Sequence, residues 1–71
     1  MDFNIKISNL VPDLTPSERK LASLLRMELS SKEIAEIMNI SSKSVDMARY
    51  RLRKKLNLDN DINIVEHLKS L

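Results

Sequence analysis

The chain of 71 residues contains no cysteine, no glycine and no tryptophan, and it has only two prolines. Without cysteine no disulfide can hold the fold together, so a core this small must be stabilised by the packing of apolar side chains. Without glycine there is no glycine-rich loop of the kind that holds nucleotide phosphates. The lack of cysteine also indicates that the chain does not depend on an oxidising compartment, and we expect a cytoplasmic protein.

Long apolar runs and catalytic sets are missing as well. No apolar run approaches the roughly 18 residues that a membrane-spanning helix needs, and the N-terminus has no signal-peptide pattern, so we expect no membrane partner. Histidine occurs once, as His67, and we expect it on the polar side of the last helix. No nucleophile or metal-ligand set accompanies it. We therefore expect no enzyme, no metal site and no cofactor.

What the chain does have is a strongly uneven distribution of charge. The net charge of the whole chain is only +2, but residues 43–55 carry six Lys/Arg and one Asp, which is a net +5. Residues 1–42 sum to −1 and residues 56–71 to −2. A positive charge concentrated in one segment is typical of a protein surface that binds a polyanion.

This basic segment has two opposite faces when it is wound as a helix at about 100° per residue. One stripe is apolar and is expected to face the core: Val45, Ala48, Leu52 and Leu56. The opposite stripe is mixed and is expected to be exposed: Lys43, Met47, Tyr50 and Lys54, with Asp46, Arg51 and Arg53 at its flanks. Such a surface combines cations that suit phosphates with shorter or flatter groups that suit base edges.

The residues just before the basic segment predict a short helix and a tight turn. Ser30 is a good N-cap, and Glu33 completes a capping box with it. Ile34, Ile37 and Met38 form the expected apolar stripe of this helix. Asn39 suits the left-handed conformation of a compact turn, and Ser41 can cap the basic helix. A short helix, a turn and a longer basic helix make a helix-turn-helix.

Further helices are predicted on both sides of this motif. In LTPSER, Thr15 is the expected N-cap and Pro16 the first helical residue of a helix that buries its leucines. Asp61 is the expected cap of a last helix whose apolar arc comprises Ile64, Val65, Leu68 and Leu71. We expect Met27 and Met38 in the core. The predicted fold is all-α, with four helices of about eight to fifteen residues and an N-terminal arm or short helix over residues 1–13.

The segments LTPSER, LSSKEIAEIMNIS and SVDMARYRLRKKLNL resemble the LuxR/GerE/FixJ-type DNA-binding domain over about residues 14–71. The resemblance implies a four-helix LuxR-type helix-turn-helix domain. Its third helix, about residues 42–56, would enter the major groove, and its fourth would serve dimerisation. The run RYRLRKKLNL further resembles regulators of the Bacteroides group, in which this domain is the C-terminal end of a much larger sensor protein.

The resemblance also implies a role for individual residues of this chain. Base-reading places fall on Asp46, Met47 and Tyr50. Places that contact or neighbour the DNA backbone fall on Lys43, Ser44, Arg51 and Lys54, and the start of the second helix, which approaches phosphate, falls on Ser31 and Lys32.

Four positions depart from the pattern of the family. Glycine is usual where this chain has Glu28, Asn39 and Asn57, and a cation is common where it has Asp46. Glu28 would be strained by ~1 kcal/mol in a left-handed conformation. Asp46 would either accept from a cytosine amino group or repel phosphate and narrow the choice of sites.

The predicted function is sequence-specific binding of double-stranded DNA for transcription regulation. Expected partners are DNA, RNA polymerase indirectly, and a second copy in a weak homodimer that pairs on DNA or through a larger parent protein. One alternative is a promoter-binding module like sigma-factor region four, which shares the ERxxxxLL and EIAxxMxIS layout but not the helix after Leu58. The other is a helical protein-interaction domain that offers its basic face to an acidic partner.

Overall fold

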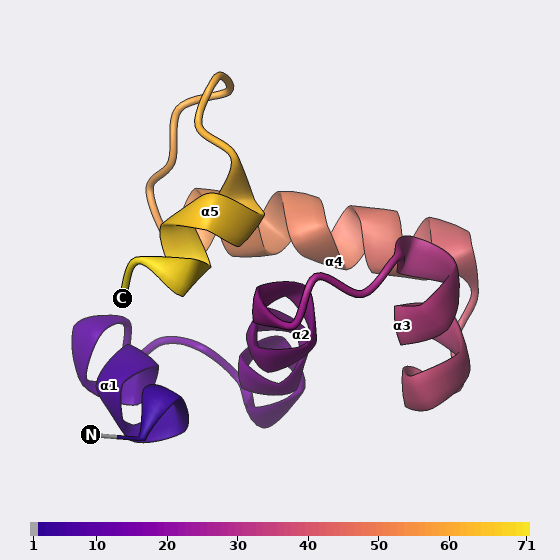
Figure 1. Ribbon diagram of the computed structural model, residues 1–71, viewed down its shortest axis with the longest axis horizontal. Coiled ribbons are helices and arrows are strands. Elements are labelled where there is room, and N and C mark those ends of the chain that lie inside the picture. Colours follow the sequence, from indigo (N-terminus) through magenta and orange to yellow (C-terminus); the bar gives the residue numbers. More distant parts are fainter. Residues whose placement is uncertain (1) are drawn as a thin grey trace.

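The computed structural model describes residues 2–71, which form five α-helices and no β-strand (Figure 1). The helices are α1 (Phe3–Leu10), α2 (Pro16–Arg26), α3 (Ser31–Met38), α4 (Ser42–Lys55) and α5 (Ile64–Lys69). The all-α fold is thereby confirmed, and α1 shows that the N-terminal segment is a short helix. Among the described residues no helix combines the length and the apolar character needed to cross a membrane.

Helix α2 is the centre of the fold, since it contacts each of the other four helices. Helix α4 is the longest and extends across the molecule, with α3 packed against one end of it (Figure 1). Helices α1 and α5 lie toward the opposite side in that view. The helix-turn-helix formed by α3 and α4 is therefore held from the core side by α2.

Each helix begins at a side chain that accepts a hydrogen bond from a backbone amide of the first turn. These N-caps are Asp2, Thr15, Ser30, Ser41 and Asn63. The predicted capping box of α3 is confirmed: the Ser30 amide donates to Glu33 Oε1 at 3.0 Å and the Glu33 amide to Ser30 Oγ at 3.1 Å. Hydrogen bonding by Ser30, first of all from its amide, lowers the pKa of the Glu33 carboxyl because it stabilises the charged form.

The expected cap of the last helix was wrong. Asn63, not Asp61, caps α5 by accepting from the Glu66 amide at 3.1 Å. The helix therefore begins at Ile64 and has 6 residues, fewer than expected. The backbone of Asn63 is extended, with φ −75° and ψ 119°, so helical geometry begins only after this residue and Asp61 lies too early in the chain to cap it.

The core is apolar and draws on every helix. Its buried members are Ile7, Leu14, Leu21, Ala22, Leu25, Ile34, Ala35, Val45, Leu52, Ile64 and Leu68. In α4, Val45 and Leu52 are fully buried, whereas Ala48 and Leu56 are partly buried and pack against the core. The predicted phase of α4 is therefore confirmed.

The prediction of a buried position was wrong for two apolar side chains. Met27 is 66% exposed, because it ends α2 where the chain turns away from the core. Ile37 is 50% exposed, because Ala35 rather than Ile37 completes the buried side of α3 beside Ile34. A small alanine at this place permits a closer approach of α3 to its neighbours than a branched side chain would.

Three helix ends use the left-handed conformation without any glycine. Glu28, Asn39 and Asn57 have φ angles of 62°, 57° and 58°. In each case the amide of the next residue bonds a carbonyl five residues back, as Ile40 does with Ala35 at 3.0 Å. Asparagine tolerates this conformation at modest cost, but glutamate does not, so position 28 carries the backbone strain expected from the sequence.

Because of this strain, we expect a glycine variant at position 28 to be more stable than an alanine variant. Glu28→Gly and Glu28→Ala both remove the ion pair of Glu28 Oε2 with Lys69 Nζ, which is 3.3 Å long. Glycine avoids the Cβ clash, so we expect the glycine variant to be more stable than the alanine variant by roughly 0.5–1 kcal/mol in urea unfolding.

The control is the same pair of substitutions at Lys20, an exposed position inside α2. There the order should reverse, because glycine is the poorer helix former. An alanine variant at position 28 that equals or exceeds the glycine variant would contradict the assigned strain.

Burial of Leu52 predicts a large loss of stability on truncation. Leu52→Ala should cost roughly 2–5 kcal/mol and largely unfold a domain of this size. Met47→Ala on the same helix should change the free energy of unfolding by less than about 0.5 kcal/mol, because Met47 is 50% exposed. Thermal melting followed by circular dichroism measures both. A melting curve of Leu52→Ala close to wild type would rule out the phase of α4.

Candidate nucleic-acid interface

The outer face of α4 carries a surface groove of about 500 Å³. It is lined by Lys43, Asp46, Met47, Tyr50, Arg51 and Lys54. All six were predicted from the sequence as site residues, and all six are exposed. Met47 and Tyr50 are 50% and 58% exposed, so both side chains are left out of the core and are available to a partner.

Tyr50 and Lys54 are coupled to each other within this groove. Lys54 Nζ lies 4.7 Å from the centre of the Tyr50 ring, which is within the range of a cation–π interaction. The two residues are four positions apart and therefore lie on the same side of the helix. The groove thus presents a positive charge directly beside an aromatic face.

Two of the six cations in residues 43–55 are turned toward the protein. Arg49 Nη1 donates to Ser31 Oγ at 3.3 Å. Arg53 donates to the carbonyl oxygens of Ile62 at 2.8 Å and of Asp59 at 2.6 Å. The expectation that Arg53 flanks the exposed face was therefore wrong, because its guanidinium holds the loop that follows α4.

A third cation, Lys55, ties the end of α4 to the start of α2. Its Nζ lies 2.8 Å from Glu18 Oε1, which also accepts from the Thr15 amide at 2.8 Å. Burial raises the pKa of the Glu18 carboxyl, but hydrogen bonds from Lys55 and Thr15 outweigh this effect, so the pKa lies below its usual value. The contribution of Glu18 to stability is therefore present at neutral pH and is lost as the pH falls through the lowered pKa.

The remaining three cations are Lys43, Arg51 and Lys54. Within residues 2–71 none of their side chains makes a hydrogen bond or an ion pair, and all three line the groove on the outer face. The positive segment seen in the sequence thus divides equally into cations that hold the fold and cations that face outward. The sequence did not predict this division, because it depends on partners from distant segments.

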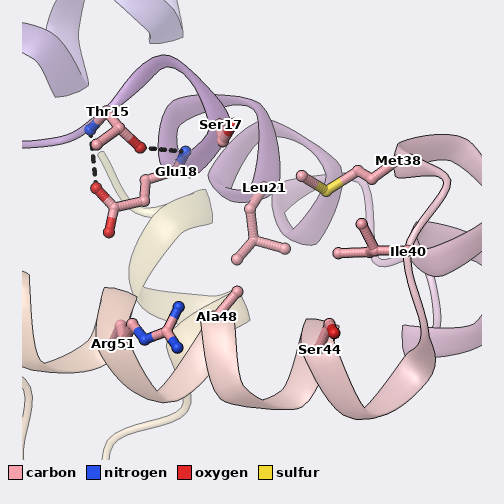
Figure 2. A pocket seen from close by; sticks show the side chains of 9 residues that line it. All are labelled: Thr15, Ser17, Glu18, Leu21, Met38, Ile40, Ser44, Ala48 and Arg51. Carbon is pink, nitrogen blue, oxygen red and sulfur yellow. Dashed lines mark hydrogen bonds between the residues drawn. The ribbon is translucent and has the colours of Figure 1, made fainter.

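A second cleft, of about 420 Å³, lies between the start of α2 and α4 (Figure 2). Leu21, Met38 and Ala48 are among its apolar lining, and Ser44 and Arg51 reach it from α4. Arg51 lines both this cleft and the groove on the outer face, so it stands between them. The cleft was not predicted from the sequence, since its walls come from three separate segments.

The last predicted site residues lie at the helix starts. Ser44 is exposed, and its amide donates to Ser41 Oγ at 3.0 Å. Ser31 opens α3 and is half-buried, and its hydroxyl donates to Asp46 Oδ1 at 3.1 Å. Lys32 follows it and is exposed. The structure thus brings Ser31 into contact with the outer groove, whereas Ser44 lines the cleft beside it.

Comparisons with known proteins find relatives among bacterial regulatory proteins. The model of the family described as bacterial regulatory proteins of the luxR family matches residues 12–68. The tetrathionate response regulatory protein TtrR of Salmonella typhimurium is 34% identical over 58 residues, which cover 82% of this chain and 28% of TtrR. The transcriptional regulatory protein UhpA of Escherichia coli is 34% identical over 68 residues, covering 94% of this chain and 35% of UhpA.

A third relative is the transcriptional regulatory protein MctR of Rhizobium johnstonii, which is 35% identical over 54 residues. These residues cover 76% of this chain and 25% of MctR. The chain thus spans between 25% and 35% of the length of these three relatives. No solved structure matches the chain significantly.

Proposed function

The chain belongs to the luxR family of bacterial regulatory proteins, which are DNA-binding transcription regulators, and from this premise we propose that α4 binds the major groove in a sequence-specific way. The observation that carries the proposal is the groove on the outer face of α4, where three outward cations surround Met47 and Tyr50. An α-helix with its side chains is about as wide as the major groove, so this face can approach base edges and both flanking backbones.

The residues of the face divide by chemistry into two roles. Lys43, Arg51 and Lys54 are proposed to contact phosphates, because they carry charge without a hydrogen-bond or ion-pair partner within residues 2–71. The proposed phosphate contacts at the edges are Ser31, Lys32 and Ser44.

Asp46, Met47 and Tyr50 are proposed to read bases. A carboxylate accepts from the amino group of cytosine, an apolar side chain contacts the methyl group of thymine, and a phenol reaches donors and acceptors on base edges. These three side chains lie among the outward cations in the same groove, so phosphate contacts on either side would hold them against the base pairs.

Anchoring and reading residues should respond differently to truncation. Arg51→Ala and Lys54→Ala should weaken binding to all duplex sequences alike and reduce the slope of log affinity against log salt by about 0.9 for each phosphate that the variant no longer neutralises. Tyr50→Ala and Met47→Ala should instead change which sequences are preferred, as measured by selection from random duplex DNA.

Arg53→Ala is the matched control, because Arg53 lies on the same helix but donates to the loop after it. It should lower stability and leave the salt slope unchanged. A change of preference in Arg51→Ala without a change of slope would reverse the two roles. If the wild-type chain did not bind random duplex DNA at low salt, the alternative of an acidic protein partner would be favoured.

The chain is further proposed to be the DNA-binding part of a longer cytoplasmic regulator. It spans between 25% and 35% of the length of the three relatives, and we propose that it acts on RNA polymerase indirectly. Residues 14–71 would carry DNA binding. Helix α1 belongs to the same folded unit, because Ile7 is fully buried in the common core.

Pairing of two copies is proposed to be weak in the absence of DNA. Ile64 and Leu68 of α5 are buried in the core of their own domain, and Val65 and Leu71 are half-buried, so little apolar surface is left for a partner. The other side of α5 is polar, which suits only a small and wet interface. DNA or a longer parent protein would supply the proximity that two copies need.

Sedimentation of the chain without DNA tests this point. We expect mainly monomer at micromolar concentration, because the apolar arc of α5 is used within the domain. A tight dimer at low micromolar concentration would show that this arc packs against a second copy instead.

A further inference from the structure

A chain of three polar side chains joins the start of α3 to the outer face of α4. Arg49 Nη1 donates to Ser31 Oγ at 3.3 Å, and Ser31 Oγ donates in turn to Asp46 Oδ1 at 3.1 Å. Arg49 and Ser31 are half-buried, whereas Asp46 is exposed. This series of hydrogen bonds therefore leads from two half-buried side chains to an exposed carboxylate in the groove.

The carboxylate of Asp46 accepts the proton of the Ser31 hydroxyl, a donor that is also chemically suited to a phosphate. A hydroxyl has a single proton to donate, so Ser31 cannot donate to Asp46 and to a phosphate at the same time. Asp46 also has no ion-pair partner within residues 2–71, although it lies among Lys43, Arg51 and Lys54. Its negative charge therefore acts directly on whatever enters the groove.

We propose that Asp46 is an internal competitor for DNA phosphate: it holds the Ser31 hydroxyl, and through it Arg49, in the free protein. This inference rests on the proposed binding of DNA by α4. A DNA strand that approaches the start of α3 must take Ser31 from Asp46 and must also overcome the repulsion between Asp46 and its phosphates. Both effects weaken binding to DNA of any sequence.

The competition has a consequence for selectivity. Sequences that place an amino group of cytosine near Asp46 give the displaced carboxylate a new hydrogen-bond donor, and these sequences recover part of the lost affinity. Sequences without such a donor recover nothing. Asp46 thus acts as a specificity-determining residue by penalising the wrong sites more than it favours the right ones.

The test replaces Asp46 with asparagine, which keeps an oxygen acceptor for Ser31 and removes the charge. Affinity for random duplex DNA at low salt should rise by about fivefold. This factor corresponds to the repulsion between two unit charges about 4 Å apart in water, here the carboxylate and a phosphate. The ratio of affinities for a selected site and for random DNA should fall, and added salt should diminish the gain. Asp46→Ala removes charge and acceptor together, so it also releases the Ser31 hydroxyl and should show a larger rise.

Glu66→Gln is the matched control, since it makes the same change of net charge at an exposed position of α5 outside the groove. It should leave both affinities unchanged. If it raised the affinity as much as Asp46→Asn does, the effect would be one of net charge alone and the inference would be wrong.

A second arm separates competition for Ser31 from simple repulsion. In a Ser31→Ala background the hydroxyl is gone, so the gain from Asp46→Ala, which removes the acceptor, should be smaller than in the wild-type background. Equal gains in both backgrounds would overturn the competition, and a loss of affinity in Asp46→Asn or Asp46→Ala would overturn the whole inference. A wild-type chain that bound no DNA at low salt would instead contradict the proposed function.

Discussion

The rotation of α4 about its own axis determines what this protein presents to a partner. Val45 and Leu52 fix that rotation, because both are fully buried and lie two turns apart on the same side of the helix. With these two side chains held in the core, Met47 and Tyr50 must face outward. The nature of the outer face is therefore a consequence of core packing in a domain of 71 residues that has no disulfide.

The cations of α4 are divided between stability and binding by this same rotation. Lys55 pairs with Glu18 of α2, and Arg53 bonds the loop toward α5, so these charges hold the last turns of the helix in place. Lys43 and Arg51 remain outward, toward the proposed path of the DNA backbone. The net charge counted along the sequence is therefore larger than the charge carried by the outer face itself.

Caps, turns and helix phase could be predicted from the sequence, because each depends on residues within a few positions of one another. Ser30 with its capping box and Asn39 with its positive φ are examples. The direction of Arg53 could not be predicted, because a long side chain can bond any carbonyl within reach. In the loop before α5, Asp61 and Asn63 are both suitable caps by residue type, and the choice between them depends on the backbone path of the loop, which the sequence alone does not give.

We propose that DNA contacts the outer face of α4 and the start of α3, and that the rest of the domain does not contact it. Amide chemical shifts followed by NMR during titration with duplex DNA test this claim most directly. We expect the largest changes at residues 31–32 and 43–54, and little change in α1 and α5. Large changes along α5, with α4 unaffected, would contradict it.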